Sequence, residues 1–237
     1  MLIYYFRYLI WLAVLPVIRL CNYVNSKDSS EEPQYVLRKF FILGILSTVP
    51  AGLIESYMST ILPDDLTVFA NEGYYALLVN VFLGVGIVEE LCKYLIVLFL
   101  GYRNEEFNQT YDIVVYSVYT SLGFACFENL MYVFEGGIST ALLRMFTAVP
   151  GHACFGVIMG YFFSKAKKRG LKRDFFGEVI YIILALIVPA ILHAIYDSLV
   201  MSENEELFLI WIIYVIGLFA VSYGEVNRMS DNNETFR

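Results

Sequence analysis

The stretch ALLVNVFLGVGIVEELCKYLIVLFL, residues 76–100, determines how the rest of the chain is interpreted. An α-helix rises 1.5 Å per residue, so a run of this length can cross the hydrocarbon core of a bilayer, which is about 30 Å thick. Three charged residues, Glu89, Glu90 and Lys93, lie near its middle. The stretch therefore predicts a transmembrane helix with a polar centre.

Six further apolar runs are long enough to cross a bilayer. They cover residues 2–20, 38–58, 112–134, 141–164, 178–200 and 207–224. None shows the alternating pattern of strands in an outer-membrane barrel. The composition agrees, because 59% of the residues are hydrophobic and only 16% are charged, whereas soluble domains have about a quarter charged. We therefore predict an all-α, polytopic transmembrane bundle of seven spans, with residues 1–237 forming one membrane domain.

Basic and acidic residues alternate from loop to loop. The first, third and fifth loops and the tail carry Arg19, Lys27, Arg38, Lys39, Arg103, Lys165, Lys167, Lys168, Arg169, Lys172, Arg173, Arg228 and Arg237. The loops between them carry Asp64, Asp65, Glu72, Glu135, Glu203, Glu205 and Glu206 instead. Positively charged flanks stay in the cytoplasm, so the N-terminus is predicted outside and the C-terminus in the cytoplasm. The net charge of −7 argues against a nucleic-acid partner and leaves the lipid bilayer as the surroundings.

The charges in the third span require compensation, since an ionisable residue at mid-membrane costs about 2.5–3.5 kcal/mol. Helical spacing makes Lys93 a neighbour of Glu89 at i,i+4 and of Glu90 at i,i+3. One lysine neutralises one carboxylate, and the second is left protonated or beside water and another cation, as a general base would be. The alternative is that these charged residues only hold neighbouring helices together through polar contacts.

The fourth span places Glu128 and Asn129 side by side in an apolar helix, and Phe124 shares the face of Glu128. Gly123 lets another helix approach closely, so that Glu128 can reach a partner. Asn129 by itself would form a structural hydrogen bond between helices. Arg144, near the outer end of the next span, is either an interface anchor or a site residue.

The only two histidines, His152 and His193, both lie within predicted spans. Gly156 and Gly160 follow His152 at helical spacing and favour close packing beneath the imidazole. Asp197 stands at i+4 from His193, where its carboxylate can accept a proton from one ring nitrogen and orient the ring. Counted along the spans, these side chains reach similar depths, which predicts one shared polar cavity.

Acids and imidazoles around buried water are suited to hydrolysis. The chain has neither the Gly-x-Ser-x-Gly nor the His-Glu-x-x-His motif. No cofactor or metal is predicted. If a metal were bound, His152, His193 and Glu128 would supply three ligands from separate helices.

In order, Glu89-Glu90-x-x-Lys93, Phe124-x-x-x-Glu128-Asn129, His152 with Gly156, and His193-x-x-x-Asp197 resemble the motifs of the PrsW family of intramembrane proteases, relatives of the type II CAAX prenyl endopeptidases. Tyr111-Asp112, Arg144 and Tyr196 are similar to further family positions, and the motif-bearing core covers about residues 76–200.

The resemblance implies a glutamic-type protease in a bacterial plasma membrane. It would make the first (site-1) cut in a single-pass anti-sigma factor during a stress response. Glu89 would be the principal base, assisted by Glu128, while Glu90 and Lys93 would balance charge. His193 and Asp197 would shape the oxyanion side, and His152 would contribute a further polar group.

Two other functions fit the same residues. Chains of buried Glu, Asp and His also build proton relays in transporters and channels, although no repeated half is visible here. A non-catalytic scaffold of the same fold is the third reading.

Overall fold

The computed structural model describes residues 2–63 and 65–236, and every long element in them is helical. The α-helices are α1 (Leu2–Ser26), α2 (Gln34–Ile61), α3 (Asp65–Glu72), α4 (Tyr74–Val81), α5 (Ile87–Ile96), α6 (Asp112–Phe146), α7 (Ala148–Leu171), α8 (Phe175–Met201) and α9 (Glu205–Asp231), and two π-helical segments, η1 (Phe82–Gly86) and η2 (Val97–Gly101), flank α5. The predicted all-α class is confirmed. Asp64, Arg237 and the side chain of Asp65, which the charge-based topology uses, lie outside the described residues.

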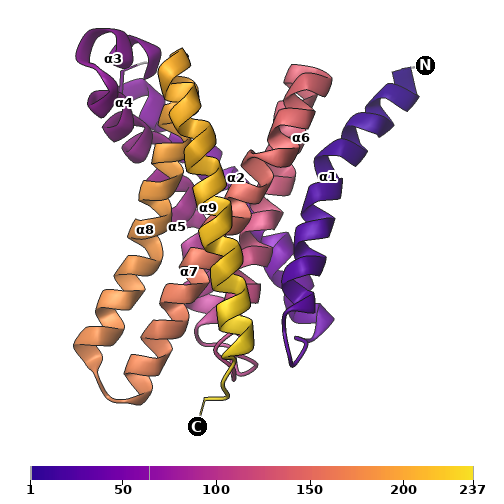
Figure 1. Ribbon diagram of the computed structural model, residues 1–237, viewed down its shortest axis with the longest axis vertical. Helices are drawn as coiled ribbons and strands as arrows, with labels where there is room; N and C mark the ends of the chain where they lie inside the picture. Colours follow the sequence, from indigo (N-terminus) through magenta and orange to yellow (C-terminus); the bar gives the residue numbers. More distant parts are fainter. Residues whose placement is uncertain (1, 64, 237) are drawn as a thin grey trace.

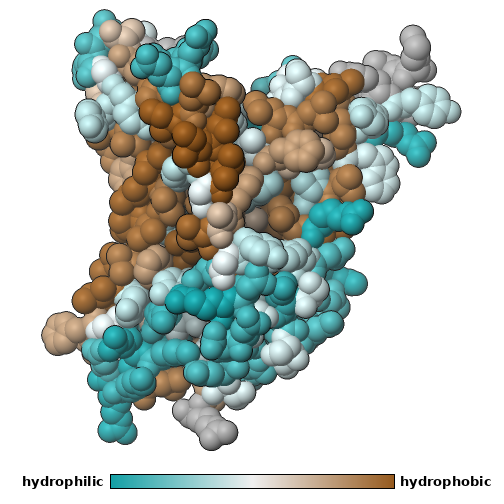
Figure 2. Space-filling model, in the orientation of Figure 1, coloured by the Kyte–Doolittle hydropathy of each residue, from teal (hydrophilic) through white to brown (hydrophobic). Residues whose placement is uncertain are grey.

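Five helical stretches of the described chain are long and apolar enough to cross a membrane. They are Arg7–Ser26, Gln34–Ile61, Asp112–Leu171, Phe175–Met201 and Glu205–Asp231, and the third of them contains both α6 and α7. The predicted span 76–100 corresponds to the run from α4 to η2, which differs from these five in its charged middle. Apolar side chains cover much of the visible face of the bundle above its hydrophilic end (Figure 2). Leu53 on α2 and Ile213 on α9 are 70% and 71% exposed. The polytopic bundle is therefore confirmed.

The beginning of α1 and the end of α9 lie at opposite ends of the bundle (Figure 1), as an odd number of crossings requires. The turn between α7 and α8, with its basic residues, lies at the same end as the C-terminus, and this end is strongly hydrophilic (Figure 2). The assignment of this end to the cytoplasm stays a prediction.

Helix α6 packs against α1, α2 and α7, and glycines allow its closest crossings. A Cβ atom added to Gly123 would collide with the backbone of Phe41 on α2, and one added to Gly44 would collide with Thr120. On α7, a Cβ atom at Gly160 would lie 2.5 Å from the Cα of Val114. The close helix approaches predicted from Gly123 and Gly160 are confirmed.

The chain turns back at Gly137, inside the stretch labelled α6, so the predicted span 141–164 corresponds to the last residues of α6 together with most of α7. Gly137 has φ 69° and ψ −152°, and Thr147 is also non-helical. An unbroken helix would separate Glu128 from Arg144 by about 24 Å. Instead, Arg144 Nη2 lies 2.9 Å from Glu128 Oε2. A positive φ is accessible to glycine because it has no Cβ, which explains the position of the turn.

Candidate active site

Helix α5 supplies the polar centre, and it lies between the two π-helical segments. A π turn is rare and is frequently found at functional sites. Glu90 and Lys93 are fully buried and Glu89 is 5% exposed. Three charged side chains are thus held almost out of contact with solvent, so their partners within the protein determine their behaviour.

The Lys93 ammonium is the hub of this centre. Its Nζ atom lies 2.8 Å from Glu90 Oε1, 3.1 Å from Glu89 Oε2 and 3.0 Å from His152 Nδ1. The ring of Phe124 adds a cation–π contact, with the centroid 4.1 Å from Nζ. The two ion pairs predicted from helical spacing are confirmed, and His152 joins them from α7.

These contacts fix the tautomer of His152. A lysine ammonium only donates hydrogen bonds, so Nδ1 is the acceptor and carries no proton. The ring proton is then on Nε2, which donates to Glu128 Oε2 at 2.8 Å. His152 therefore links the charged residues of α5 to the carboxylate of α6.

His193 on α8 is held between carboxylates at both ring nitrogens. Nδ1 lies 3.0 Å from Glu90 Oε1 and 3.9 Å from Glu89 Oε2, while Nε2 lies 3.2 Å from Asp197 Oδ2. The pairing of His193 with Asp197 at i+4 is confirmed. Phe155 stacks on the imidazole with ring centroids 4.8 Å apart, so the ring has little freedom to turn.

Glu128 also receives the side chain that the turn at Gly137 brings back. Arg144 donates to Glu128 and, through Nε, to Asn129 Oδ1 at 3.0 Å. Asn129 in turn donates to the Ala13 carbonyl oxygen of α1 at 3.1 Å. Arg144 is therefore part of the polar network, and Asn129 joins two helices as predicted.

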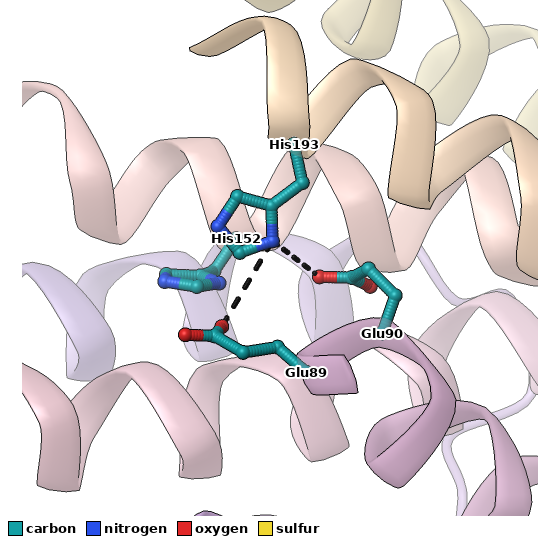
Figure 3. Close-up of side chains that lie close together, drawn as sticks. All are labelled: Glu89, Glu90, His152 and His193. Carbon is teal, nitrogen blue, oxygen red and sulfur yellow. Dashed lines mark hydrogen bonds and ion pairs between the residues drawn. The ribbon is translucent and has the colours of Figure 1, made fainter. Parts of the chain in front are cut away.

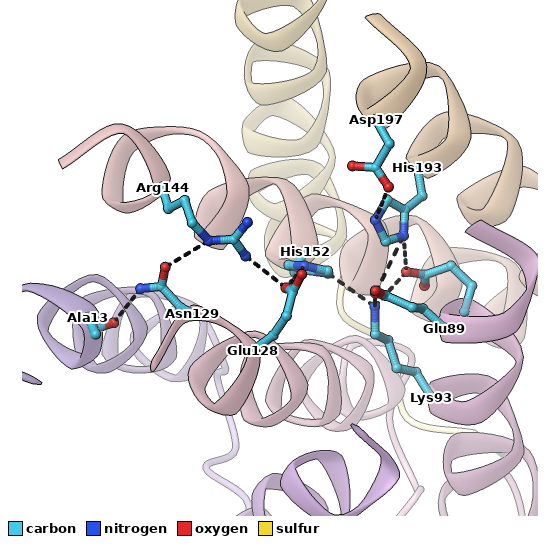
Figure 4. A network of polar contacts seen from close by, with 10 residues as sticks. Ala13, Glu89, Lys93, Glu128, Asn129, Arg144, His152, His193 and Asp197 are labelled. Atoms are coloured by element: carbon cyan, nitrogen blue, oxygen red, sulfur yellow. Dashed lines mark hydrogen bonds and ion pairs between the residues drawn. The ribbon is translucent and has the colours of Figure 1, made fainter. Parts of the chain in front are cut away.

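One network connects the charged, histidine and asparagine side chains of the predicted motifs (Figure 4). It runs from Ala13 through Asn129, Arg144, Glu128, His152, Lys93, Glu89 and Glu90 to His193 and Asp197. Four helices, α5, α6, α7 and α8, supply its side chains, and α1 contributes a backbone carbonyl oxygen at one end. The predicted convergence of acids and imidazoles from separate spans is confirmed.

A cavity of about 560 Å³ adjoins this network. Its charged lining residues are Glu55, Glu89, Glu128, Arg144 and Asp197, and its aromatic ones include Phe124, Tyr132, Tyr196 and Trp211. Neither Glu90 nor Lys93 lines it, so the two adjacent glutamates differ in position. Glu89 faces the cavity, whereas Glu90 lies behind it between Lys93 and His193.

Glu55 on α2 is a site residue that the sequence analysis missed. It lines the same cavity, and its Oε1 atom is buried without a hydrogen-bond partner. The sequence could have indicated this residue, because burying a lone carboxylate inside the predicted span 38–58 has the same free-energy cost as burying those in the third span. By contrast, Asp112 lies at the start of α6, where its partners are loop residues 108 and 109, outside this network.

Four side chains could hold a metal ion here. One ligand atom from each of Glu89, Glu90, His152 and His193 lies within 4.8 Å of the others (Figure 3). The set named from sequence contained Glu128 instead. Glu128 approaches the other ring nitrogen of His152, Nε2, and lies outside the group of four that the described residues form.

The fold and the site together define an integral membrane protein with a carboxylate-lined cavity inside its helix bundle, and comparison with known proteins gives the class of that site. Residues 32–223 match the family described as "PrsW family intramembrane metalloprotease". The chain is therefore an intramembrane protease, and it belongs to the PrsW family.

Curated relatives agree over most of their length. The chain is 34% identical to "Protease PrsW" of Geobacillus kaustophilus over 90% of this chain and 86% of that one. It is 31% identical to "Protease PrsW" of Clostridioides difficile over 94% and 92%, and 30% identical to that of Oceanobacillus iheyensis over 92% and 94%. No solved structure matches. These relatives support the protease interpretation over the transporter and the scaffold.

Proposed function

We propose that this protease cleaves a single-pass membrane protein, such as an anti-sigma factor, at the plasma membrane of a bacterial cell, with Glu89 as the base that activates water. One observation supports the role of Glu89 above all. It is the carboxylate of α5 that lines the cavity, and Lys93 holds it in place from behind. A base must reach the proton that it takes, and Glu90 has no such access.

The other residues of the polar network have complementary roles in this proposal. Glu128 assists Glu89 and is oriented by His152 and Arg144. Asp197 orients His193, and this pair lies on the side where an oxyanion would develop. Glu90 and Lys93 balance the charge of the site.

The position of the cavity bears on where the substrate is cut. Val200 and Met201, which line the cavity, belong to the end of α8 that lies opposite the C-terminus. If the C-terminus is cytoplasmic, the cut bond lies toward the outer face. This placement is suited to the first cut in a single-pass substrate.

A metal-dependent mechanism is the second candidate, because the family description names a metalloprotease and the four converging donors fit a divalent metal. Glu89, Glu90, His152 and His193 would hold it, and the metal would supply a water of lowered pKa. Lys93 Nζ stands among these same donors, so the lysine would have to turn away.

The test uses purified full-length protein in nanodiscs with a candidate single-pass substrate. We expect Glu89→Gln to lower the cleavage rate by about 100-fold or more, since a general base contributes that much. Glu205→Gln, an exposed acid on α9, is the matched control and should cleave like the wild type. Wild-type cleavage by a folded Glu89→Gln protein would refute the role of Glu89.

The same preparation distinguishes the two mechanisms. Cleavage that survives chelation, in protein with less than one bound metal per ten chains by elemental analysis, supports the metal-free route. Loss of cleavage on chelation, with recovery on adding zinc, supports the metal-dependent route and assigns Glu89 to the metal instead.

A further inference from the structure

A second group of buried carboxylates lies far from the cavity, at the end of the bundle that carries the C-terminus. Asp28 and Glu32 come from the loop between α1 and α2, and Asp112 begins α6. One oxygen atom from each lies within 4.8 Å of the others. Asp28 is 8% exposed, Glu32 6% and Asp112 0%.

Hydrogen-bond donors occupy only one oxygen of each carboxylate. Asp28 Oδ1 accepts from the Ser30 amide at 3.1 Å, and Glu32 Oε2 accepts from the Tyr116 hydroxyl at 2.5 Å. Asp112 Oδ2 accepts from the amides of residues 108 and 109 at 2.9 and 2.6 Å. Two of the three remaining oxygens, Asp28 Oδ2 and Asp112 Oδ1, are buried and have no hydrogen-bond partner.

No basic side chain compensates this group. In residues 2–63 and 65–236, none of the three carboxylates forms an ion pair with Lys, Arg or His. Buried like charges repel strongly, and an unpaired buried carboxylate is costly. Protons or a bound cation must therefore supply the missing positive charge.

We propose that Asp28, Glu32 and Asp112 form a binding site for a hard divalent cation of the Ca²⁺ or Mg²⁺ class, separate from the protease site. Such cations take oxygen ligands, and Ca²⁺–oxygen distances are about 2.3–2.6 Å. Two ligands of one Ca²⁺ ion are then at most about 5 Å apart. The three carboxylates satisfy this limit, since one oxygen of each lies within 4.8 Å of the others.

The site would tie together segments that are distant in the sequence. Next to it, Asn233 of the tail bonds to the Tyr111 amide at 3.0 Å and to Ser29 Oγ at 3.0 Å. Ser230 donates to the Lys27 carbonyl oxygen at 2.5 Å. A bound cation therefore stabilises the junction of the α1–α2 loop, the start of α6 and the C-terminal tail.

Protonation is the competing way to compensate the charge, and pH separates the two. Protons and a cation compete for the same carboxylate oxygens, so a cation should bind at pH 8 and be displaced at pH 5.

The experiment measures ⁴⁵Ca²⁺ binding by equilibrium dialysis, with Mg²⁺ as competitor, and the thermal unfolding of chelator-treated full-length protein. We expect about one ion per chain at pH 8 and millimolar concentration, with a rise in Tm of roughly 3–8 °C. Binding should be at least tenfold weaker at pH 5. Absence of binding of both ions at pH 8 overturns the proposal.

Three variants locate the ion. Glu32→Gln and Asp112→Asn should weaken binding at least tenfold, whereas Glu31→Gln, an exposed acid in the same loop, is the matched control and should bind like the wild type. In ion-free buffer at pH 8, Glu32→Gln should raise Tm because it removes a repelling charge. This variant should therefore stay folded, and its ion binding can be measured even if Asp112→Asn does not fold. Equal binding by Glu32→Gln and the wild type would place the ion elsewhere and refute the site. Glu89→Gln should leave ⁴⁵Ca²⁺ binding and the ion-dependent rise in Tm unchanged. Failure of this proposal and failure of the protease mechanism therefore remain distinguishable.

Discussion

Replacing Lys93 with methionine removes the hub of the polar centre while keeping a side chain of similar length. The ammonium contacts Glu89, Glu90 and His152 within 3.1 Å and is fully buried. Its loss leaves two buried carboxylates without their counter-charge. Breaking a buried pair in this way costs about 3–5 kcal/mol. For a chain of this size, that loss corresponds to a fall in Tm of roughly 6–20 °C.

The measurement is thermal unfolding in nanodiscs, followed by tryptophan fluorescence and by the loss of monodisperse protein. Lys168→Met is the control, because Lys168 forms an ion pair with Glu234 on the surface, and its removal should leave Tm within error of the wild type. A second substitution, Glu90→Gln, should restore part of the stability of Lys93→Met by removing one orphaned charge.

The result that would refute this reasoning is a Lys93→Met protein as stable as the wild type. It would mean that Glu89 and Glu90 do not depend on the ammonium, either because both are neutral or because another cation replaces it. Failure of Glu90→Gln to restore any stability would show that the loss comes from packing against Phe124 and not from charge.

Three further predictions follow from other parts of the structure. Gly123→Val should destabilise the bundle by about 1–3 kcal/mol, since its side chain would collide with the backbone of Phe41. Gly217→Val is the control, because a Cβ atom there meets nothing within 4 Å, and it should cost less than about 1 kcal/mol in the same unfolding measurement. Glu55→Gln should lower kcat/KM about tenfold, because it alters the cavity wall. It should not lower Tm, because it removes a buried carboxylate whose Oε1 atom has no hydrogen-bond partner. An unchanged kcat/KM would show that Glu55 has no part in cleavage. Burial raises the pKa of Glu32 in the folded protein to about 7, whereas the unfolded chain releases this proton near pH 4.5. Ion-free protein should therefore lose about 1–2 kcal/mol of stability as pH rises from 4.5 to 7. Thermal scans across this pH range should show a flatter dependence for Glu32→Gln.

The amino-acid sequence by itself determined the fold class and most of the candidate site. Long apolar runs predict transmembrane helices because the bilayer leaves few other ways to satisfy the backbone. Local spacing also predicted contacts within one helix, and the pairs Glu89–Lys93 and His193–Asp197 lie as expected. The cost of burying a charge explains why acids and histidines from separate spans could be assigned to one site.

Only the tertiary structure decided which side chains meet across helices and which reach the cavity. Helical periodicity gives the relative positions of residues on one helix but not the rotation of that helix in the bundle. The sequence therefore could not show that Glu89 faces the cavity while Glu90 lies behind it, or that Lys93 reaches His152. The turn at Gly137 likewise depends on a backbone conformation, and it carries Arg144 back to Glu128, a contact that no local pattern encodes.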